Sequence, residues 1–348
     1  MKQDAHGGDI YSLDRIPLDF SISLNPRGMP PEAAQAARES VALCDRYPDS
    51  KCRALTRAAA RRDGVPEGWI LWGNGASDLI QRLVFALKPC KAIILAPTFS
   101  QYRSALELAG CRVMEHRLRQ EEGFAVTRQL MKDITPGTEL VLLCDPNNPT
   151  GQLMEEEMLL LILERCRAVG AVLAVDQCFL ELTGADPHRL TNELAGGGLC
   201  LIRALTKSYA MAGLRLGYLL CADSALSAAV AALAPPWPVS IPAQAAGEAA
   251  LTRCPRWPEE SLPLIRAGRD RLRAGLEELG LWVCPSQANY ILFHGPVGLD
   301  EALLRQDNIL LRSCANFSGL GPDWYRAAVR GTEENEWLLA ALARQLEG

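Results

Sequence analysis

Short apolar segments alternate with segments of helical periodicity between about residues 69 and 222. Five short segments are apolar on both faces and rich in Val, Ile and Leu: residues 91–97, 139–146, 170–176, 199–205 and 217–221. Such segments are typical of strands in a mostly parallel sheet that is covered by helices on both sides. Helices are predicted between them, at residues 77–87, 100–110 and 155–170. The pattern therefore predicts a large α/β domain with a mostly parallel sheet flanked by helices.

The pattern changes after residue 232. Residues 233–242, LAPPWPVSIP, hold too many prolines for a helix or a central strand and are predicted to form a linker. A long helix at 258–280, three strand-like segments (288–293, 309–314 and 325–330) and a final helix then predict a small α+β domain. We divide the chain into residues 1–45, expected to pack with the small domain, a large domain of residues 46–240 and a small domain of residues 241–348.

Composition excludes several classes of protein. The net charge of −5 comes without a basic stripe, which argues against a nucleic-acid partner. No apolar run reaches the roughly 18 residues of a membrane span, and the N-terminus lacks the apolar core of a signal peptide, so we expect a cytoplasmic protein. The twelve cysteines and four histidines are scattered without a Cys-x-x-Cys pair, so we expect no metal.

Polar groups stand where several predicted strands end. Asp176 closes one apolar segment, Asn148 follows another, and Lys207 follows a third. Ligands of open α/β sheets bind at the carboxyl ends of the strands. A lysine in this setting is either a side chain that reaches the surface from the edge of the core or a functional amine, and Asp176 is either a helix cap or a ligand group.

A glycine-rich turn adds an anion site to this set. WGNGASDLI, residues 72–80, opens a helix whose free N–H groups favour a phosphate, and Arg215 can bind the same phosphate bidentately. An amine, a carboxylate, an amide and an anion site together suit pyridoxal phosphate, which has an aldehyde, a ring nitrogen that should be protonated and a phosphate. The companions of Lys207 therefore favour the functional interpretation.

The order of these motifs resembles a known superfamily. DPNNPTG (145–151), Asp176 and TKSYAMAGLRLGY (206–218) resemble the fold type I pyridoxal-phosphate enzymes, the aspartate aminotransferase superfamily, over nearly the whole chain. Within it, the chain is most similar to the branch of histidinol-phosphate aminotransferases and threonine-phosphate decarboxylases. The segments that carry this likeness are HGGD (6–9), LDFSISLNPRG (18–28), PTFSQY (97–102), SQANYILF (286–293) and LLRSCANFSGLG (310–321).

The resemblance implies roles for individual residues toward the cofactor. Lys207 would bind the cofactor covalently, Asp176 would pair with its ring nitrogen, and Asn148 would donate to its ring hydroxyl oxygen. Tyr102 would stack on the ring. The cofactor phosphate would be held by Ala76 and Ser77 (backbone), Thr206, Arg215, and Tyr47 from the neighbouring subunit, which implies a homodimer with shared sites.

The resemblance also implies how a substrate binds. Arg326 would bind the substrate carboxylate, with Arg312, Asn25 and His6 close by. The sequence departs from the superfamily pattern at Phe179, where a tyrosine usually donates to the ring hydroxyl, and at Ala204, where a serine or threonine often binds the phosphate.

The implied reaction is the removal of a carboxylate from a small phosphorylated amino acid, with L-threonine O-3-phosphate, a precursor in cobalamin synthesis, as the first choice. Transamination, with histidinol phosphate as substrate, is the alternative, and a catalytically silent cofactor-binding protein is the third reading. The sequence leaves lyase and transferase open, because both reactions begin in the same way.

Overall fold

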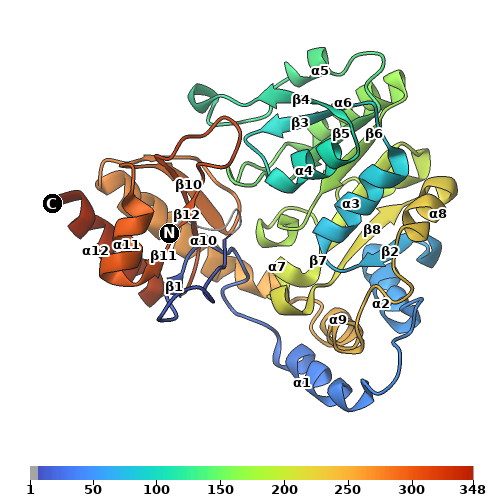
Figure 1. Cartoon of the computed structure of the whole chain (residues 1–348), viewed down its shortest axis with the longest axis horizontal. Coiled ribbons are helices and arrows are strands. Elements are labelled where there is room, and N and C mark those ends of the chain that lie inside the picture. Colours follow the sequence, from blue (N-terminus) through green and yellow to red (C-terminus); the bar gives the residue numbers. More distant parts are fainter. Residues whose placement is uncertain (1–6, 348) are drawn as a thin grey trace.

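A computed structural model describes residues 7–347, in which a large and a small sheet form the centres of two lobes (Figure 1). The strands of the large sheet lie in the order β2 (Ile70–Gly73), β8 (Gly217–Cys221), β7 (Leu199–Ala204), β6 (Val172–Asp176), β5 (Leu140–Cys144), β3 (Lys91–Ala96) and β4 (Arg112–Arg117). All neighbours pair in parallel except β8, which is antiparallel to both β2 and β7. The predicted α/β class is confirmed. The strands β2 and β4 were not predicted.

Helices cover both faces of this sheet. One face carries α3 (Ala76–Leu87), α4 (Ser100–Leu108) and α8 (Ser224–Ala232), and the other carries α2 (Arg53–Asp63), α6 (Glu156–Val169) and α9 (Ile241–Arg253). Side chains alternate between the faces. In β3, Ile94 packs on the face covered by α3, α4 and α8, and Ile93 packs on the face covered by α2, α6 and α9. Because both faces are buried, the strands are apolar throughout.

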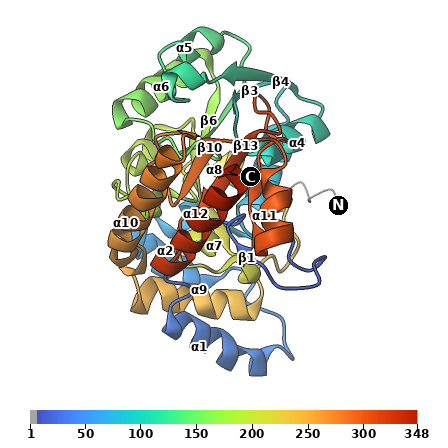
Figure 2. The same ribbon diagram turned by 90° about the vertical axis from the view of Figure 1, so that its left-hand side faces the viewer.

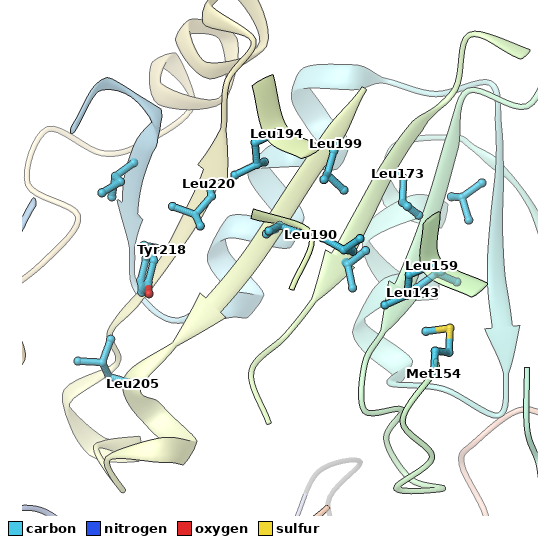
Figure 3. Close-up of a cluster of buried hydrophobic side chains, with 14 of the residues drawn as sticks. Leu143, Met154, Leu159, Leu173, Leu190, Leu194, Leu199, Leu205, Tyr218 and Leu220 are labelled. Atoms are coloured by element: carbon cyan, nitrogen blue, oxygen red, sulfur yellow. The ribbon is translucent and has the colours of Figure 1, made fainter. Parts of the chain in front are cut away.

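The core on the second face is continuous across four strands. Figure 3 shows Leu143, Leu173, Leu199 and Leu220 from β5, β6, β7 and β8 in one buried cluster, with Leu159 of α6 beside them. This packing fixes the strands relative to one another. Their carboxyl ends, where the polar residues stand, are therefore held on a rigid base.

The small lobe is built on an antiparallel sheet in the order β12 (Arg312–Ser313), β13 (Trp324–Ala328), β10 (Tyr290–His294) and β9 (Trp282–Val283). Figure 2 shows α10 (Trp257–Glu278), α11 (Leu299–Asp307) and α12 (Thr332–Glu347) in front of this sheet. The strand β1 (Leu18–Asp19) pairs in parallel with β11 (Ile309–Leu310), and Phe20 is buried in the core of the small lobe. The beginning of the described N-terminal segment thus packs with the small lobe.

Two helices near the predicted domain boundaries pack together. The helix α1 (Pro31–Ser40), within the segment expected to pack with the small domain, lies along α9 instead (Figure 1). The helix α9, which the predicted division assigns to the small domain, buries Ala243, Ala246 and Ala250 in the core of the large sheet. The boundaries at residues 45 and 240 stay a prediction, and packing alone would begin the small lobe after α9.

The remaining elements are short. Two single-turn helices are α5 (Leu130–Asp133) and α7 (Leu205–Ser208), and 3₁₀ turns lie at Val41–Leu43, Glu67–Trp69, Gln120–Glu122, Leu180–Leu182, Thr191–Gly196 and Ala212–Leu214. The twelve cysteines are all free thiols, most of them buried. Within residues 7–347, no helix has the length and apolar character to cross a membrane. In that same range, no group of three or more His, Cys, Asp or Glu could hold a metal ion.

Candidate active site

A cavity of about 390 Å³ lies where the carboxyl ends of β5, β6 and β7 face the small lobe. It brings together most of the residues predicted for the site. Those that line it are Ala76, Ser77, Asn148, Asp176, Thr206, Lys207, Arg215, Arg312 and Arg326. The residues predicted from the strand ends therefore lie around one cavity, to which both lobes contribute.

Lys207 is carried by α7, which begins directly after β7. Its Nζ lies 5.6 Å from the centre of the Phe179 ring. Burial, followed by the positive charge of Arg326, lowers the pKa of Lys207 to about 8. The amine is thereby neutral over a wider pH range than an ordinary lysine, and the neutral amine is the form that bonds to an aldehyde carbon.

Asp176 ends β6 and has a donor on each carboxylate oxygen. The Tyr102 hydroxyl donates to Oδ2 at 2.8 Å, and the Cys178 N–H donates to Oδ1 at 3.0 Å. Burial raises the pKa of Asp176, whereas the hydrogen bonds from Cys178 and Tyr102 and the charge of Lys207 act in the opposite direction. A buried carboxylate of this kind gains from a cationic N–H partner, so the site fits the protonated ring nitrogen of pyridoxal phosphate.

The N-terminus of α3 suits the phosphate of that cofactor. Gly75 caps this helix with a φ of +81°, and no side chain caps the N–H groups of the first turn. A Cβ atom at Gly75 would lie 2.7 Å from Nη2 of Arg215, so only glycine allows the guanidinium this close. The first turn of α3, Arg215 and Thr206 line the same cavity and form an anion site.

Arg326, on β13, is only 7 % exposed and joins three parts of the chain. Its Nη1 donates to Oδ1 of Asn148 at 2.5 Å, and its Nη2 donates to the carbonyl oxygen of Ser21 at 2.7 Å. Its Nε is buried and has no hydrogen-bond partner within residues 7–347. Because the oxygen of Asn148 accepts from Arg326, the amide nitrogen of Asn148 is the atom left to donate into the cavity.

Arg312, on β12, is 5 % exposed and lines the same cavity. Its Nη2 donates to Oδ1 of Asn316 at 2.8 Å, and its guanidinium lies 5.3 Å from the centre of the Phe317 ring. The small lobe thus supplies two largely buried guanidinium groups to the cavity that holds Lys207. These groups can bind anions in addition to the one at the start of α3.

Tyr102 does not line the cavity as far as the structure describes it. Its ring is fully buried beneath the site. It contacts the ring of Phe99 edge to face, with 5.5 Å between the ring centres. The aromatic rings among the described lining residues belong to Phe99, Phe179 and Phe317, and the sequence analysis did not single out Phe99. The position of Phe99 in the short connection between β3 and α4, directly before the first residue of the helix, was the signal that could have identified it. The stacking role of Tyr102 stays a prediction.

Three other predicted residues lie elsewhere. The side chain of Asn25 donates to the Ser208 carbonyl oxygen at 2.8 Å and to Oγ of Ser261 at 2.7 Å, so in this structure it supports the segment that carries Lys207. Tyr47 is 74 % exposed, and its ring stacks on Trp237 with 3.9 Å between ring centres. His6 lies outside the described residues.

The two departures from the superfamily pattern are accommodated by packing. The ring of Phe179 meets Tyr290 edge to face, with 5.0 Å between the ring centres, and the Tyr290 hydroxyl donates to the Asn147 carbonyl oxygen. Ala204 is the last residue of β7 and is buried against this pair. Neither position leaves a buried polar side chain without a partner, because both side chains are apolar.

Comparison with known proteins agrees with this geometry. Residues 15–342 match the family of class I and II aminotransferases. The chain is 38% identical to a threonine-phosphate decarboxylase of Salmonella typhimurium, over 99% of this chain and 97% of the relative. It is 33% identical to a histidinol-phosphate aminotransferase of Symbiobacterium thermophilum, over 92% of this chain and 88% of the relative.

A solved structure extends the comparison to the fold. The histidinol-phosphate aminotransferase from Clostridium acetobutylicum superposes with a TM-score of 0.87 at 29% identity, over 95% of this chain and 99% of that one. Such a match covers both lobes and the cavity between them. The chain therefore belongs to the class I and II aminotransferase family, whose members are fold type I enzymes that depend on pyridoxal phosphate.

Proposed function

We propose that this protein removes the carboxylate of a small phosphorylated amino acid with the help of pyridoxal phosphate, and that the substrate is L-threonine O-3-phosphate. The observation that carries the proposal is the pair Arg312 and Arg326, two largely buried guanidinium groups in the cavity of Lys207. A substrate with both a carboxylate and a phosphate needs two anion sites besides the one for the cofactor. The decarboxylase from Salmonella typhimurium is a relative over nearly the full length of both chains.

When bound, pyridoxal phosphate supplies an electron sink for the negative charge that develops at the α-carbon of the substrate. In our proposal, Lys207 anchors its aldehyde carbon, and Asp176 pairs with the proton on its ring nitrogen. Asn148 donates to its ring hydroxyl oxygen, and Phe99 covers one face of its ring. Its phosphate is held by the N–H groups of Ala76 and Ser77, by Thr206 and by Arg215.

The small-lobe arginines determine which bond breaks. Arg326 and Arg312 would bind the two anionic groups of the substrate and so hold the α-carbon in the orientation in which its bond to the carboxylate breaks. Bound pyridoxal phosphate would accept the electron pair that the departing carbon dioxide leaves behind, and the α-carbon would then take up a proton. We assign this proton to Nζ of Lys207, whose pKa of about 8 suits a group that gives and regains a proton near neutral pH.

Transamination of histidinol phosphate is the second candidate. It is favoured by the 33% identity to the enzyme from Symbiobacterium thermophilum and by the fold match to the enzyme from Clostridium acetobutylicum. Both substrates carry a phosphate, so an arginine that binds the phosphate does not separate them. Histidinol phosphate has no carboxylate to lose, so the release of carbon dioxide separates the two substrates.

Two assays on the purified holoenzyme distinguish the candidates. The first supplies threonine phosphate and measures carbon dioxide and aminopropanol phosphate, and the second supplies histidinol phosphate with 2-oxoglutarate and measures glutamate. We expect product only in the first assay. Glutamate without carbon dioxide would replace our proposal by the aminotransferase, and bound cofactor with no product in either assay would indicate a silent cofactor-binding protein.

We also propose that the working unit is a cytoplasmic homodimer with shared active sites. Tyr47 and Trp237 present a stacked aromatic pair to solvent, and Val41 and Leu43 beside Tyr47 in the sequence are exposed as well. Large apolar side chains at a surface favour an interface. In a dimer, Tyr47 would be available to the cofactor phosphate of the neighbouring subunit.

A further inference from the structure

The Tyr102 hydroxyl and the Asp176 carboxylate form a buried pair, with 2.8 Å between the phenol oxygen and Oδ2. We propose that Tyr102 is a positioning residue, which fixes the orientation and charge of Asp176 so that this carboxylate binds the protonated ring nitrogen of the cofactor. The inference rests on the proposed placement of the ring nitrogen at Asp176. It does not depend on whether the reaction is decarboxylation or transamination.

Two rigid donors define one orientation of the carboxylate. Tyr102 is fully buried in α4 among apolar residues such as Leu79 and Leu106, and the other donor is the backbone N–H of Cys178. Each donor takes one lone pair of a different oxygen. The Cys178 thiol is a further hydrogen-bond partner of the carboxylate. A lone pair still remains for an N–H group in the cavity that Asp176 lines.

The phenol also supports the charged state of Asp176. The titratable groups that face this carboxylate are Tyr102, Cys144, Cys178, Lys207 and Tyr290. Burial raises the pKa of Asp176, and the hydrogen bond from Tyr102 is among the contacts that lower it. Burial and the negative charge of Asp176 hold the pKa of Tyr102 well above its usual value, so the phenol stays a donor throughout the working pH range.

The first turn of α4 couples this carboxylate to the cavity wall. The edge-to-face contact of Tyr102 with Phe99 involves only the ring, with 5.5 Å between the ring centres, whereas the contact with Asp176 involves only the hydroxyl. Replacing Tyr102 by phenylalanine therefore removes the donor and keeps the packing. Any change in the behaviour of Asp176 in this variant can be assigned to the hydroxyl.

The chain offers a matched control in Tyr218. This tyrosine is also buried in the large lobe, and its hydroxyl donates to a buried carboxylate, Oδ2 of Asp63, at 2.8 Å. Neither Tyr218 nor Asp63 is among the described residues that line the cavity. Tyr218→Phe thus loses the same kind of hydrogen bond without touching the cofactor site.

The test compares two ligands in a titration of the apo-protein followed by absorbance. One ligand is pyridoxal phosphate, and the other is the analogue in which carbon replaces the ring nitrogen, so that no ring proton reaches Asp176. We expect Tyr102→Phe to weaken the binding of pyridoxal phosphate about tenfold, since a hydrogen bond to a charged group is lost. The affinity for the analogue should stay within about twofold of that of the unmodified protein. Tyr218→Phe should change neither affinity.

Other outcomes overturn the proposal. If Tyr102→Phe weakens the binding of both ligands equally, Tyr102 has a general packing role. If the affinity for both ligands is unchanged, the hydroxyl has no effect on the binding of the ring nitrogen. If Tyr102→Phe does not fold, 3-fluorotyrosine at position 102 keeps the packing and donates more strongly. It should then increase the preference for pyridoxal phosphate over the analogue, and an unchanged preference would overturn the proposal.

Asp176→Asn separates this inference from the function on which it rests. If Asp176→Asn abolishes the preference for the nitrogen-containing ring and Tyr102→Phe does not reduce it, only the role of Tyr102 is wrong. If Asp176→Asn leaves that preference intact, the placement of the ring nitrogen at Asp176 is itself wrong.

Discussion

Nη1 of Arg326 lies 2.5 Å from Oδ1 of Asn148, so a strand of the small lobe is tied directly to the loop that follows β5 of the large sheet. The same guanidinium holds the carbonyl oxygen of Ser21 in the N-terminal segment. One side chain therefore connects three segments that are far apart in the sequence. In our proposal it also touches the substrate, which makes substrate binding and the relative position of the lobes interdependent.

Arg326→Ala should lower kcat/KM for threonine phosphate by an amount equivalent to about 2–4 kcal/mol of transition-state binding, because a charge-assisted contact with a substrate anion is lost together with the hydrogen bonds to Asn148 and Ser21. Steady-state kinetics on the holoenzyme measures this effect. Arg330→Lys is the control, because Arg330 pairs with Glu334 and the Asp19 carbonyl oxygen and does not line the described cavity. Near-normal kcat/KM in Arg326→Ala would contradict the substrate role.

The lowered pKa of Lys207 predicts how cofactor capture depends on pH. With a pKa of about 8 in place of 10.5, the amine is protonated below about pH 8 and neutral above it. The rate at which the apo-protein takes up pyridoxal phosphate, followed by stopped-flow absorbance, should rise with pH and level off above about pH 8. Arg326→Met should move the midpoint to higher pH, because it removes a positive charge that opposes protonation. A midpoint near 10.5 in the unmodified protein would show that Lys207 is not perturbed.

A contact between the lobes is expected to support Arg312. Ser318 donates to Oε2 of Glu115 at 2.9 Å, and Asn316 in the same loop accepts from Arg312. Because one neutral-to-charged hydrogen bond at the surface is weak, Ser318→Ala should raise KM for threonine phosphate only about two- to fivefold, with kcat nearly unchanged. Ser104→Ala, which removes an exposed bond within α4, should leave KM as it is. Identical KM values in both variants would show that this contact has no part in substrate binding.

The buried strands could be predicted from the sequence because strands buried on both faces consist almost entirely of apolar residues. The segments around β3, β5, β6, β7 and β8 are apolar on both faces, whereas β4 is an edge strand, RVMEHR, whose side chains are mostly exposed or half-buried. The polar composition of β4 does not distinguish this strand from a loop. The short strand β2, with four residues, gives too little periodicity to be recognised.

The side chains that lie away from the cavity do so because of spatial relationships that the sequence does not encode locally. Phe99 and Tyr102 are three residues apart at the start of α4, and which ring faces the cavity depends on where the first helical turn begins. Asn25 stands in a segment that resembles the family, yet its amide is used by Ser208 and Ser261, which are far away in the chain. The residues at strand ends were easier, because parallel strands bring their carboxyl ends to one edge of the sheet.

Mixed dimers test the proposed sharing of the active site. A Tyr47→Phe subunit has an intact Lys207 and a Lys207→Ala subunit has an intact Tyr47, so a heterodimer of the two should contain one site with both groups. Co-expression with two affinity tags should yield activity well above that of either parent homodimer. Heterodimers no more active than the parents, or a fully active monomer by light scattering, would speak against sharing.

The most direct measurement counts the carbon dioxide released per subunit when the holoenzyme is given threonine phosphate and no 2-oxo acid. A decarboxylase returns the cofactor to its aldehyde form after every cycle, so we expect many equivalents of carbon dioxide and an unchanged visible absorbance. An aminotransferase would stop after one amino transfer per subunit, because nothing takes the amino group off the cofactor. Loss of the visible absorbance without carbon dioxide would contradict the proposed decarboxylation and identify the protein as a transferase.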